Sequence, residues 1–466
     1  MDFPIFHFDF IGNRMLIAIT AIIHVMINHP MAVGAIPLAT LLEWRAHKSR
    51  SLALDNLAYK ITFVMFIITT TLGAMTGVGI WFTTSMVNPA SIGSLLRVFF
   101  WAWFSEWIVF VLEVCFIMLY FLTWKRYAGE RKIKHVRMGL YLSILSWLTM
   151  AVISAILAFM MDVGRWQPFT KIWTPASGLL VAFLNPLYGP QLFFRTFAAL
   201  LSAGLFFMFL TPIFMKRSEP ERPRVVRFFA GWVLALLPVT AVAAVFYWKR
   251  IPSFMADSAP IALATQDYTH WYGSILTILT AMVVIIALAA LLGLIIPRRL
   301  PAAALVLPFV LSLTLLGTFE RVREFIRKPF VIRDYMYSNG LRIEDYALYR
   351  EDGILAHASF VRNREVTDEN RLDAGREVFL LACSRCHTMA GINSVNKRFN
   401  KLFPGEWKEE QLSAFMENMH NVRVFMPPFP GTDIERDALA AYIMANRNRS
   451  LRLEGHQTAG FFGVKP

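Results

Sequence analysis

Long apolar stretches alternate with short polar loops over the first 320 residues of the chain. Most stretches exceed the roughly 20 residues that an α-helix needs to cross a bilayer. They lie at about residues 13–43, 57–87, 96–124, 137–163, 190–216, 226–250, 270–296 and 302–320. The last is short and contains Pro308, so the pattern defines its ends less sharply. We therefore predict an all-α, polytopic membrane helix bundle of about eight transmembrane helices.

After residue 320 the pattern becomes charged and irregular, and residues 321–365 are predicted to form a connector along the membrane surface. Amphipathic periodicity then predicts short helices at Arg371–Ala382, Glu409–His420 and Glu435–Asn446. The predicted division is a membrane domain over residues 1–320, the connector over 321–365, and a small all-helical domain with a C-terminal tail over 366–466.

Composition and charge agree with a lipid bilayer as the main surroundings. Hydrophobic residues make up 56% of the chain and charged residues only 17%, which excludes an ordinary soluble protein. The formal net charge of +14 raises nucleic acid as a partner, but the basic residues gather in alternate loops. These are Arg45, Lys48 and Arg50; Lys125, Arg126, Arg131, Lys132, Lys134 and Arg137; Lys216, Arg217, Arg222, Arg224 and Arg227; and Arg298 and Arg299.

Lys- and Arg-rich loops remain cytoplasmic in membrane proteins. We therefore predict a bacterial inner-membrane protein whose N-terminus, connector and C-terminal domain face the periplasm. Because the basic excess is explained as a topology signal, no nucleic-acid partner is predicted.

Two of the three cysteines lie in the string Cys383-Ser384-Arg385-Cys386-His387. In a C-x-x-C-H motif the two cysteines bind haem covalently and the histidine coordinates its iron. A redox dithiol or half of a zinc site is the alternative, and neither gives the histidine a role. We predict one covalent haem c on Cys383 and Cys386, with His387 as an axial ligand. Its attachment outside the cytoplasm agrees with the charge pattern.

Met426 lies in the segment Val424–Phe429, directly before two prolines. This segment resembles the Met-Pro loop that supplies the sixth iron ligand in c-type cytochromes, where a thioether suits a low-spin iron of high potential. A methionine that merely fills a hydrophobic loop is the alternative, and Met419 and His420 are rival ligands. Residues 366–447 thus resemble a single-haem cytochrome c domain.

Ionisable residues within the apolar stretches are costly and are therefore candidates for function. The candidates selected are Arg14, His24 and His29 in the first stretch, Glu106 and Glu113 in the third, and Glu324 and Arg327 just after the eighth. Glu106 and Glu113 lie seven residues apart, on one helical face. Each residue also has a structural alternative: a packing histidine, glutamates that satisfy neighbouring helices, or an i,i+3 ion pair of Glu324 with Arg327.

Together these residues resemble subunit I of the cytochrome bd oxidases, at scattered motifs over about residues 10–335. The motifs are Asn13-Arg14 with Ile17–His24, Thr76-Gly77, Leu112-Glu113, Trp166-Gln167-Pro168 with Asn185-Pro186, and Glu324 with Arg327–Phe330. The resemblance implies that His24 and Glu324 ligate a high-spin haem and that Arg14 and Arg327 bind haem. It also implies that Glu113, with Glu106, carries protons.

The same resemblance implies one or two noncovalent haems of type b or d, and a second, similarly helical membrane subunit as a partner. Three departures from the family's pattern limit this resemblance. Arg195 stands where the family has a histidine ligand of its low-spin haem b, and a guanidinium has no lone pair for iron. The partner methionine is missing near Tyr268–Gly273, where His270 is a substitute candidate. The loop at about 250–268 is far shorter than the family's quinol-binding loop.

These departures predict that haem c replaces the low-spin haem b as the electron entry. The predicted activity is that of a bd-like terminal oxidase, which reduces oxygen or another small gas such as nitric oxide. Its electrons would come from a periplasmic cytochrome c or another redox protein. The alternative is oxidation of quinol with electrons passing out through haem c, and a third hypothesis is a non-enzymatic anchor for haem c. Whether His29 or His270 binds haem stays open.

Overall fold

The computed structural model of the protein describes residues 3–164, 183–402, 405 and 407–461. The chain forms two compact units. The bundle unit comprises residues Thr20–Gly79 and Phe99–Arg327, and the tail unit comprises Met1–Ile19, Ile80–Val98 and Lys328–Pro466. The tail unit therefore takes in two segments that the sequence pattern assigned to the membrane domain.

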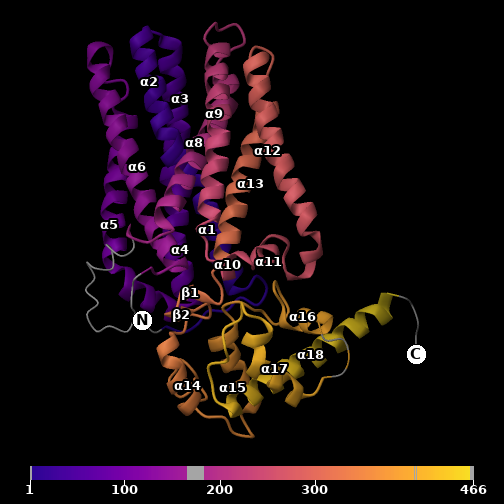
Figure 1. Ribbon diagram of the computed structural model, residues 1–466. Coiled ribbons are helices and arrows are strands. Elements are labelled where there is room, and N and C mark those ends of the chain that lie inside the picture. The colour runs from indigo at the N-terminus through magenta and orange to yellow at the C-terminus, as the bar shows by residue number, and fades with distance from the viewer. Residues whose placement is uncertain (1–2, 165–182, 403–404, 406, 462–466) are drawn as a thin grey trace. The chain divides into compact units, whose positions relative to one another are not determined.

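Long apolar helices make up most of the described chain (Figure 1). They are α1 (Asn13–Asn28), α2 (Ala35–Ser49), α3 (Leu52–Ile68), α4 (Ala74–Val87), α5 (Pro89–Leu122), α6 (Lys132–Met161), α8 (Tyr188–Phe214), α9 (Arg222–Trp248), α12 (Tyr272–Ile295) and α13 (Ala302–Ile326). Wider π-helical turns at His29–Gly34 and Thr69–Gly73 join α1 to α2 and α3 to α4.

With these joins, the described residues contain eight helical segments that are long and apolar enough to cross a membrane. The prediction of an all-α membrane bundle with about eight spans is confirmed. The motif Trp166-Gln167-Pro168 lies outside the described residues.

The core of the bundle unit lies where α2, α3, α8 and α9 run side by side (Figure 1). Large apolar side chains fill it, among them the fully buried Phe207 of α8 and Phe229 of α9, whose rings lie 4.7 Å apart. Such close packing of side chains provides the main attraction between helices in lipid, where no hydrophobic force drives them together. Two short helices, α10 (Ser253–Ala256) and α11 (Ala259–Ala264), lie between α9 and α12 along the chain.

The tail unit holds the remaining elements around a second apolar core. They are β1 (Phe330–Ile332), β2 (Met336–Tyr337), α14 (Tyr346–Asp352), α15 (Arg371–Val378), a π-helical turn (Phe379–Cys383), α16 (Val395–Leu402), α17 (Glu409–Val422) and α18 (Asp433–Phe461). The three helices predicted from amphipathic periodicity correspond to α15 with the turn after it, α17 and the start of α18.

The connector contains local order that its irregular sequence does not reveal. Strands β1 and β2 pair antiparallel. Further along, the carboxylate of Glu435 on α18 accepts hydrogen bonds from the backbone N–H groups of Ile354 (3.0 Å) and Leu355 (2.8 Å). A buried carboxylate that caps a neighbouring loop ties the connector to the helices that follow it.

Candidate haem sites and a buried ion network

The C-x-x-C-H motif is folded as a helical turn in the tail unit. The backbone N–H groups of Cys386 and His387 both donate to the carbonyl oxygen of Cys383, at 3.0 Å each. Both cysteines are free thiols. The turn thereby presents two unpaired sulfur atoms and the adjacent imidazole, which are the three groups that haem c attachment requires.

The imidazole of His387 is held in a state that suits iron coordination. The side chain of Asn393 lies 3.5 Å from Nδ1 of His387 and donates to the carbonyl oxygen of Cys386 at 2.5 Å. Burial, the Lys328 ammonium and the Arg398 guanidinium lower the pKa of His387 to about 4. The ring is therefore neutral at physiological pH, as a metal ligand must be. A covalent haem c fits these residues.

Met426 lies in the loop between α17 and α18, as the sequence placed it. Its backbone carbonyl accepts a hydrogen bond from Nδ1 of His420 at 2.6 Å, and its N–H donates to the carbonyl oxygen of Arg423 at 2.7 Å. His420 thus fixes the loop backbone, while Met419 packs against the apolar core. These contacts hold the loop that carries Met426, and the assignment of Met426 as the sixth ligand, with His420 and Met419 as rivals, stays a prediction.

Replacement of Met426 by alanine is expected to leave haem c covalently attached and to lower its midpoint potential. The physical reason is that loss of a thioether ligand removes stabilisation of ferrous iron. Potentiometric titration of the haem c absorbance measures this effect, with Met419→Ala as the matched control. An unchanged potential and spectrum in the Met426 variant would exclude it as a ligand.

His24, on α1, lies in a small polar cradle within the bundle unit. Its Nδ1 is 3.0 Å from the Thr76 hydroxyl and 3.2 Å from the carbonyl oxygen of Gly73, and the Asn28 amide nitrogen lies 3.0 Å from Nε2. A Cβ atom at Gly77 would approach Cε1 of His24 to 3.0 Å, so the absent side chain leaves room for the ring. A carbonyl that orients one ring nitrogen is the usual outer contact of a ligating histidine, so His24 fits an iron ligand.

Glu324 and Arg327 bind each other at the C-terminal end of α13. Arg327 donates from Nη2 to both carboxylate oxygens of Glu324, at 2.6 and 2.7 Å, and from Nε at 3.0 Å. The structure therefore shows the i,i+3 ion pair that the sequence left open. The ligand role of Glu324 and the haem contact of Arg327 remain predictions, and both require this pair to rearrange.

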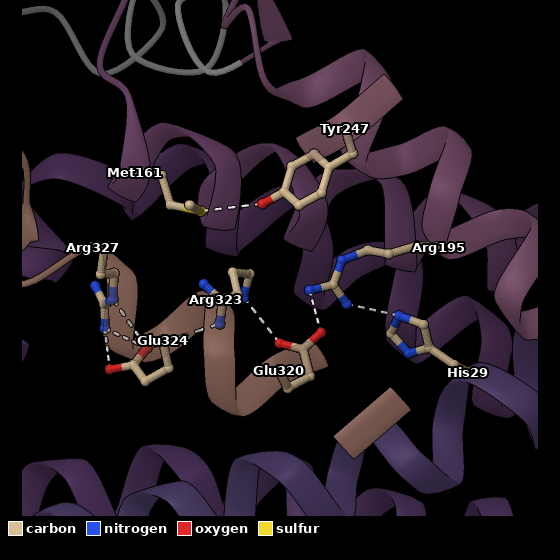
Figure 2. A network of polar contacts seen from close by, with 8 residues as sticks. All are labelled: His29, Met161, Arg195, Tyr247, Glu320, Arg323, Glu324 and Arg327. Carbon is tan, nitrogen blue, oxygen red and sulfur yellow. Dashed lines mark hydrogen bonds and ion pairs between the residues drawn. The ribbon is translucent and has the colours of Figure 1, made fainter. Parts of the chain in front are cut away.

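Arg195 of α8 is the centre of a buried ion network (Figure 2). Its guanidinium is 1% exposed, contacts Nε2 of His29 at 2.9 Å through Nη1, and forms an ion pair with Glu320 of α13 through Nη2. Glu320 also accepts from Nε of Arg323 at 3.0 Å. Because His29 directs Nε2 at a guanidinium and Arg195 offers no lone pair, a low-spin haem b with these two residues as ligands does not fit.

Sequence reasoning singled out Arg195 but missed its partners Glu320 and Arg323. A signal was present: Glu320, Arg323, Glu324 and Arg327 recur at spacings of three and four residues, and so share one face of a mostly apolar helix. His270, the other candidate substitute ligand, is exposed and lies edge-on to the Trp271 ring. It does not join this network.

Glu113 of α5 faces the polar side chains of α6. It accepts hydrogen bonds from the hydroxyl groups of Ser146 at 2.5 Å and Thr149 at 2.9 Å. Glu106 lies two turns away on the same helix. The two carboxyl groups that the sequence selected thus lie along one side of α5, and hydroxyl groups of a neighbouring helix bind the second.

A further polar cluster, missed at the sequence level, surrounds the fully buried Glu43 of α2. Its carboxylate accepts from the Tyr120 hydroxyl at 2.7 Å and from Nδ1 of His135 at 2.6 Å. The Lys132 ammonium bridges Glu43 at 3.0 Å and Asp55 at 2.7 Å. These residues come from four helices and the sequence separates them widely, so no local pattern reveals the cluster.

Two comparisons with known proteins found a match. The family model for cytochrome C oxidase, cbb3-type, subunit III matches residues 370–443. Among solved structures, the bd oxidase from Geobacillus thermodenitrificans is similar in fold, with a TM-score of 0.58 and 12% sequence identity. The match covers 71% of this chain and 90% of that chain. Comparison with curated proteins gave no match.

The fold and the motif define a multi-pass membrane protein with a haem-containing electron-transfer domain. More specifically, a helical membrane domain with the fold of a bd oxidase chain continues into a C-terminal cytochrome c domain. The resemblance stated from the motifs is confirmed at this level of fold and domain match.

Proposed function

We propose that the protein is the catalytic subunit of a bd-like terminal oxidase whose electrons enter through haem c. A soluble cytochrome c or another periplasmic redox protein would be the donor, and oxygen, or another small gas such as nitric oxide, the acceptor. Haem c would supply one-electron redox chemistry, and a noncovalent haem b or d in the membrane domain would supply the site for the gas.

The observation that carries the proposal is the Arg195 network. Arg195 stands where the family has a histidine ligand of its low-spin haem b, and here it contacts His29 and forms an ion pair with Glu320. The chain also carries a cytochrome c domain. The residues for electron entry through a low-spin haem b are therefore absent at this position, and the cytochrome c domain adds another entry site. This combination favours replacement of the low-spin haem b by haem c.

The proposed haem-binding roles of the membrane domain follow from the contacts of individual side chains. His24 would ligate the membrane haem through Nε2 while Gly73 and Thr76 orient Nδ1. This assignment requires the Asn28 amide, which contacts Nε2, to turn away. Glu324 would be the second ligand after release of Arg327, whose guanidinium would then be available to a haem propionate.

Protons for the reduction would travel along α5. Glu106, Glu113 and Tyr120 recur every seven residues, a spacing that places them on one side of the helix. Ser146 and Thr149 extend this row from α6 at Glu113, and Glu43 joins it at Tyr120. Because the loops flanking Tyr120 are rich in Lys and Arg, protons would enter from the cytoplasmic side.

The Lys- and Arg-rich loops also support the proposed localisation. They favour a periplasmic location of the N-terminus and the cytochrome domain in a bacterial inner membrane, where a soluble donor would be available. A second bd-like membrane subunit is the proposed permanent partner, on the strength of the fold similarity to a bd oxidase.

An apolar cavity in the bundle unit favours a second candidate function, oxidation of quinol with electrons passing out through haem c. The cavity measures about 480 Å³ and its walls include Tyr247, Trp248, Tyr272 and Phe319. Arg323 lines it as well, and Nη1 of this residue has no hydrogen-bond partner among the described residues. A quinone matches these walls, because it has an apolar body and a carbonyl oxygen that accepts a hydrogen bond.

The variant His24→Ala tests the leading proposal. We expect it to lose oxygen-dependent oxidation of reduced cytochrome c, together with the spectrum of the noncovalent haem it ligates, because no other imidazole occupies its cradle. His270→Ala, which removes an exposed histidine, is the matched control and should retain both. Full activity in His24→Ala and in Glu324→Ala would rule out the proposed catalytic site.

A further inference from the structure

The buried cluster around Glu43 reaches solvent through Asp55. The Asp55 side chain, in the first turn of α3, is 28% exposed, whereas that of Lys132 is only 8% exposed. The side chains of Glu43 and His135 are fully buried. All these residues lie near the Lys- and Arg-rich loops that join α2 to α3 and α5 to α6. Ionisable side chains are costly inside a membrane bundle, so a cluster of them with one exposed member suggests a function.

Short contacts run without a gap from Asp55 to Tyr120. Nζ of Lys132 lies 2.7 Å from Oδ1 of Asp55 and 3.0 Å from Oε1 of Glu43. The other oxygen of Glu43, Oε2, accepts a hydrogen bond from the Tyr120 hydroxyl at 2.7 Å. Proton transfer requires heavy atoms within about 2.6–3.2 Å, and all three contacts meet this condition. They connect a partly exposed carboxylate to a buried phenol.

His135 balances the charge of this path. Its Nε2 lies 2.7 Å from the backbone carbonyl oxygen of Tyr120, and its Nδ1 lies 2.6 Å from Oε1 of Glu43. A carbonyl oxygen only accepts, so Nε2 carries a proton, and the contact with Glu43 needs a second proton on either atom. This second proton and the Lys132 ammonium together offset the carboxylates of Glu43 and Asp55.

Neighbouring side chains hold the path in place. Nε1 of Trp124 donates to Oδ2 of Asp55 at 3.3 Å, and Nζ of Lys132 lies 4.1 Å from the centre of the Trp124 ring. A Cβ atom at Gly139 of α6 would collide with the Thr40 hydroxyl and approach the Tyr120 ring to 2.9 Å. The missing side chain at Gly139 therefore lets α2, α5 and α6 close around the cluster.

We propose that Asp55, Lys132 and Glu43 form the proton inlet of the bundle unit, and that Lys132 carries each proton from Asp55 to Glu43. The inference rests on the proposed function, which supplies the demand for protons. Lys132 gives one proton to the Glu43 carboxylate and takes one from the aqueous phase through Asp55. Glu43 passes a proton to the Tyr120 oxygen while the Tyr120 hydroxyl proton leaves toward Glu113. One proton enters for each that leaves, so the charge of the cluster is restored after every transfer.

Lys132→Arg separates a proton carrier from a structural cation. Arginine keeps the positive charge and can bind both carboxylates, but a guanidinium stays protonated and passes no proton on. Oxygen consumption with a reduced donor should fall about tenfold, or about 1.4 kcal/mol in barrier. Reduction of haem c by the donor in rapid mixing needs no proton and should keep its rate. Lys134→Arg, at an exposed position of the same helix, is the matched control and should retain full turnover.

Asp55→Asn tests the mouth of the inlet. It keeps the size of the side chain and removes the carboxylate that exchanges protons with the aqueous phase, so turnover should again fall about tenfold. Because the site is partly exposed, added formate should reach Lys132 and restore much of the rate. Glu130→Gln, at an exposed position of the neighbouring loop, is the control and should show neither the loss nor the rescue.

Turnover at the wild-type rate in either Lys132→Arg or Asp55→Asn would overturn the inference. A lower rate that formate does not restore, together with a lower thermal unfolding midpoint in both variants, would assign the cluster to stability and overturn it as well. A wild-type protein that consumes no oxygen with any reduced donor would give a different result. It would contradict the proposed function itself, and the inference would fall with it.

Discussion

His387→Ala is expected to abolish oxidation of a reduced periplasmic donor while the noncovalent haem of the membrane domain keeps its spectrum. The variant removes the axial imidazole, which is neutral in the folded protein and therefore available to iron. Without it, haem c loses the ligand that sets its low-spin state and its potential. Because haem c is the electron entry in the proposed route, turnover should fall by at least about a hundredfold, or about 2.7 kcal/mol in barrier.

Two controls make this result specific. Cys115→Ser removes the third cysteine, on α5, and should leave donor oxidation intact. A reconstituted oxygen-consumption assay with quinol as the only donor distinguishes the candidate functions. Oxygen consumption from quinol that survives in His387→Ala would show an entry site independent of haem c, and would contradict the proposed route.

Glu320→Ala is expected to destabilise the bundle unit strongly. The carboxylate is the ion-pair partner of both Arg195 and Arg323, and all three side chains are buried. Its removal takes away the anion bound to Arg195 and leaves Arg323 with only the more distant Glu324, at 3.9 Å, and loss of one partner of a buried pair costs about 3–5 kcal/mol. Thermal unfolding of the purified protein in detergent, followed by helical circular dichroism, should show a large fall in midpoint.

A double variant tests whether this cost comes from the uncompensated charge. Replacing Arg195 and Glu320 together by leucine removes the buried pair, and such replacements are often neutral or stabilising. The double variant should therefore be more stable than Glu320→Ala. Glu130→Ala, at an exposed loop position, serves as the control for loss of a carboxylate. An unfolding midpoint of Glu320→Ala equal to that of the control would show that the network carries no net stabilisation.

The features predicted from the sequence are those encoded locally. A membrane span requires about 20 consecutive apolar residues, so each of the eight could be found from its own stretch of chain. The haem motif is equally local, because five consecutive residues contain both sulfur atoms and the imidazole. The amphipathic helices of the tail follow the same rule, although α18 extends to Phe461, beyond the predicted end at Asn446.

The features missed depend on contacts between distant segments. Asp9 binds the backbone of Met389 across 380 positions, and Glu43 meets His135 across 92. Neither carboxylate has a local motif, and only the fold brings it to its partner. For Glu324 the sequence was ambiguous for a physical reason: a carboxylate three residues before an arginine suits an ion pair and a metal ligand alike, and the structure shows the ion pair.

The most direct test of the account is a carbon monoxide difference spectrum of the reduced, purified complex, with the haems quantified by type. The account predicts one covalent haem c per chain, at least one noncovalent haem b or d, and a carbon monoxide adduct of the noncovalent haem that disappears in His24→Ala. Haem c as the sole pigment, with no response to carbon monoxide, would contradict a catalytic membrane domain and favour a membrane anchor for haem c.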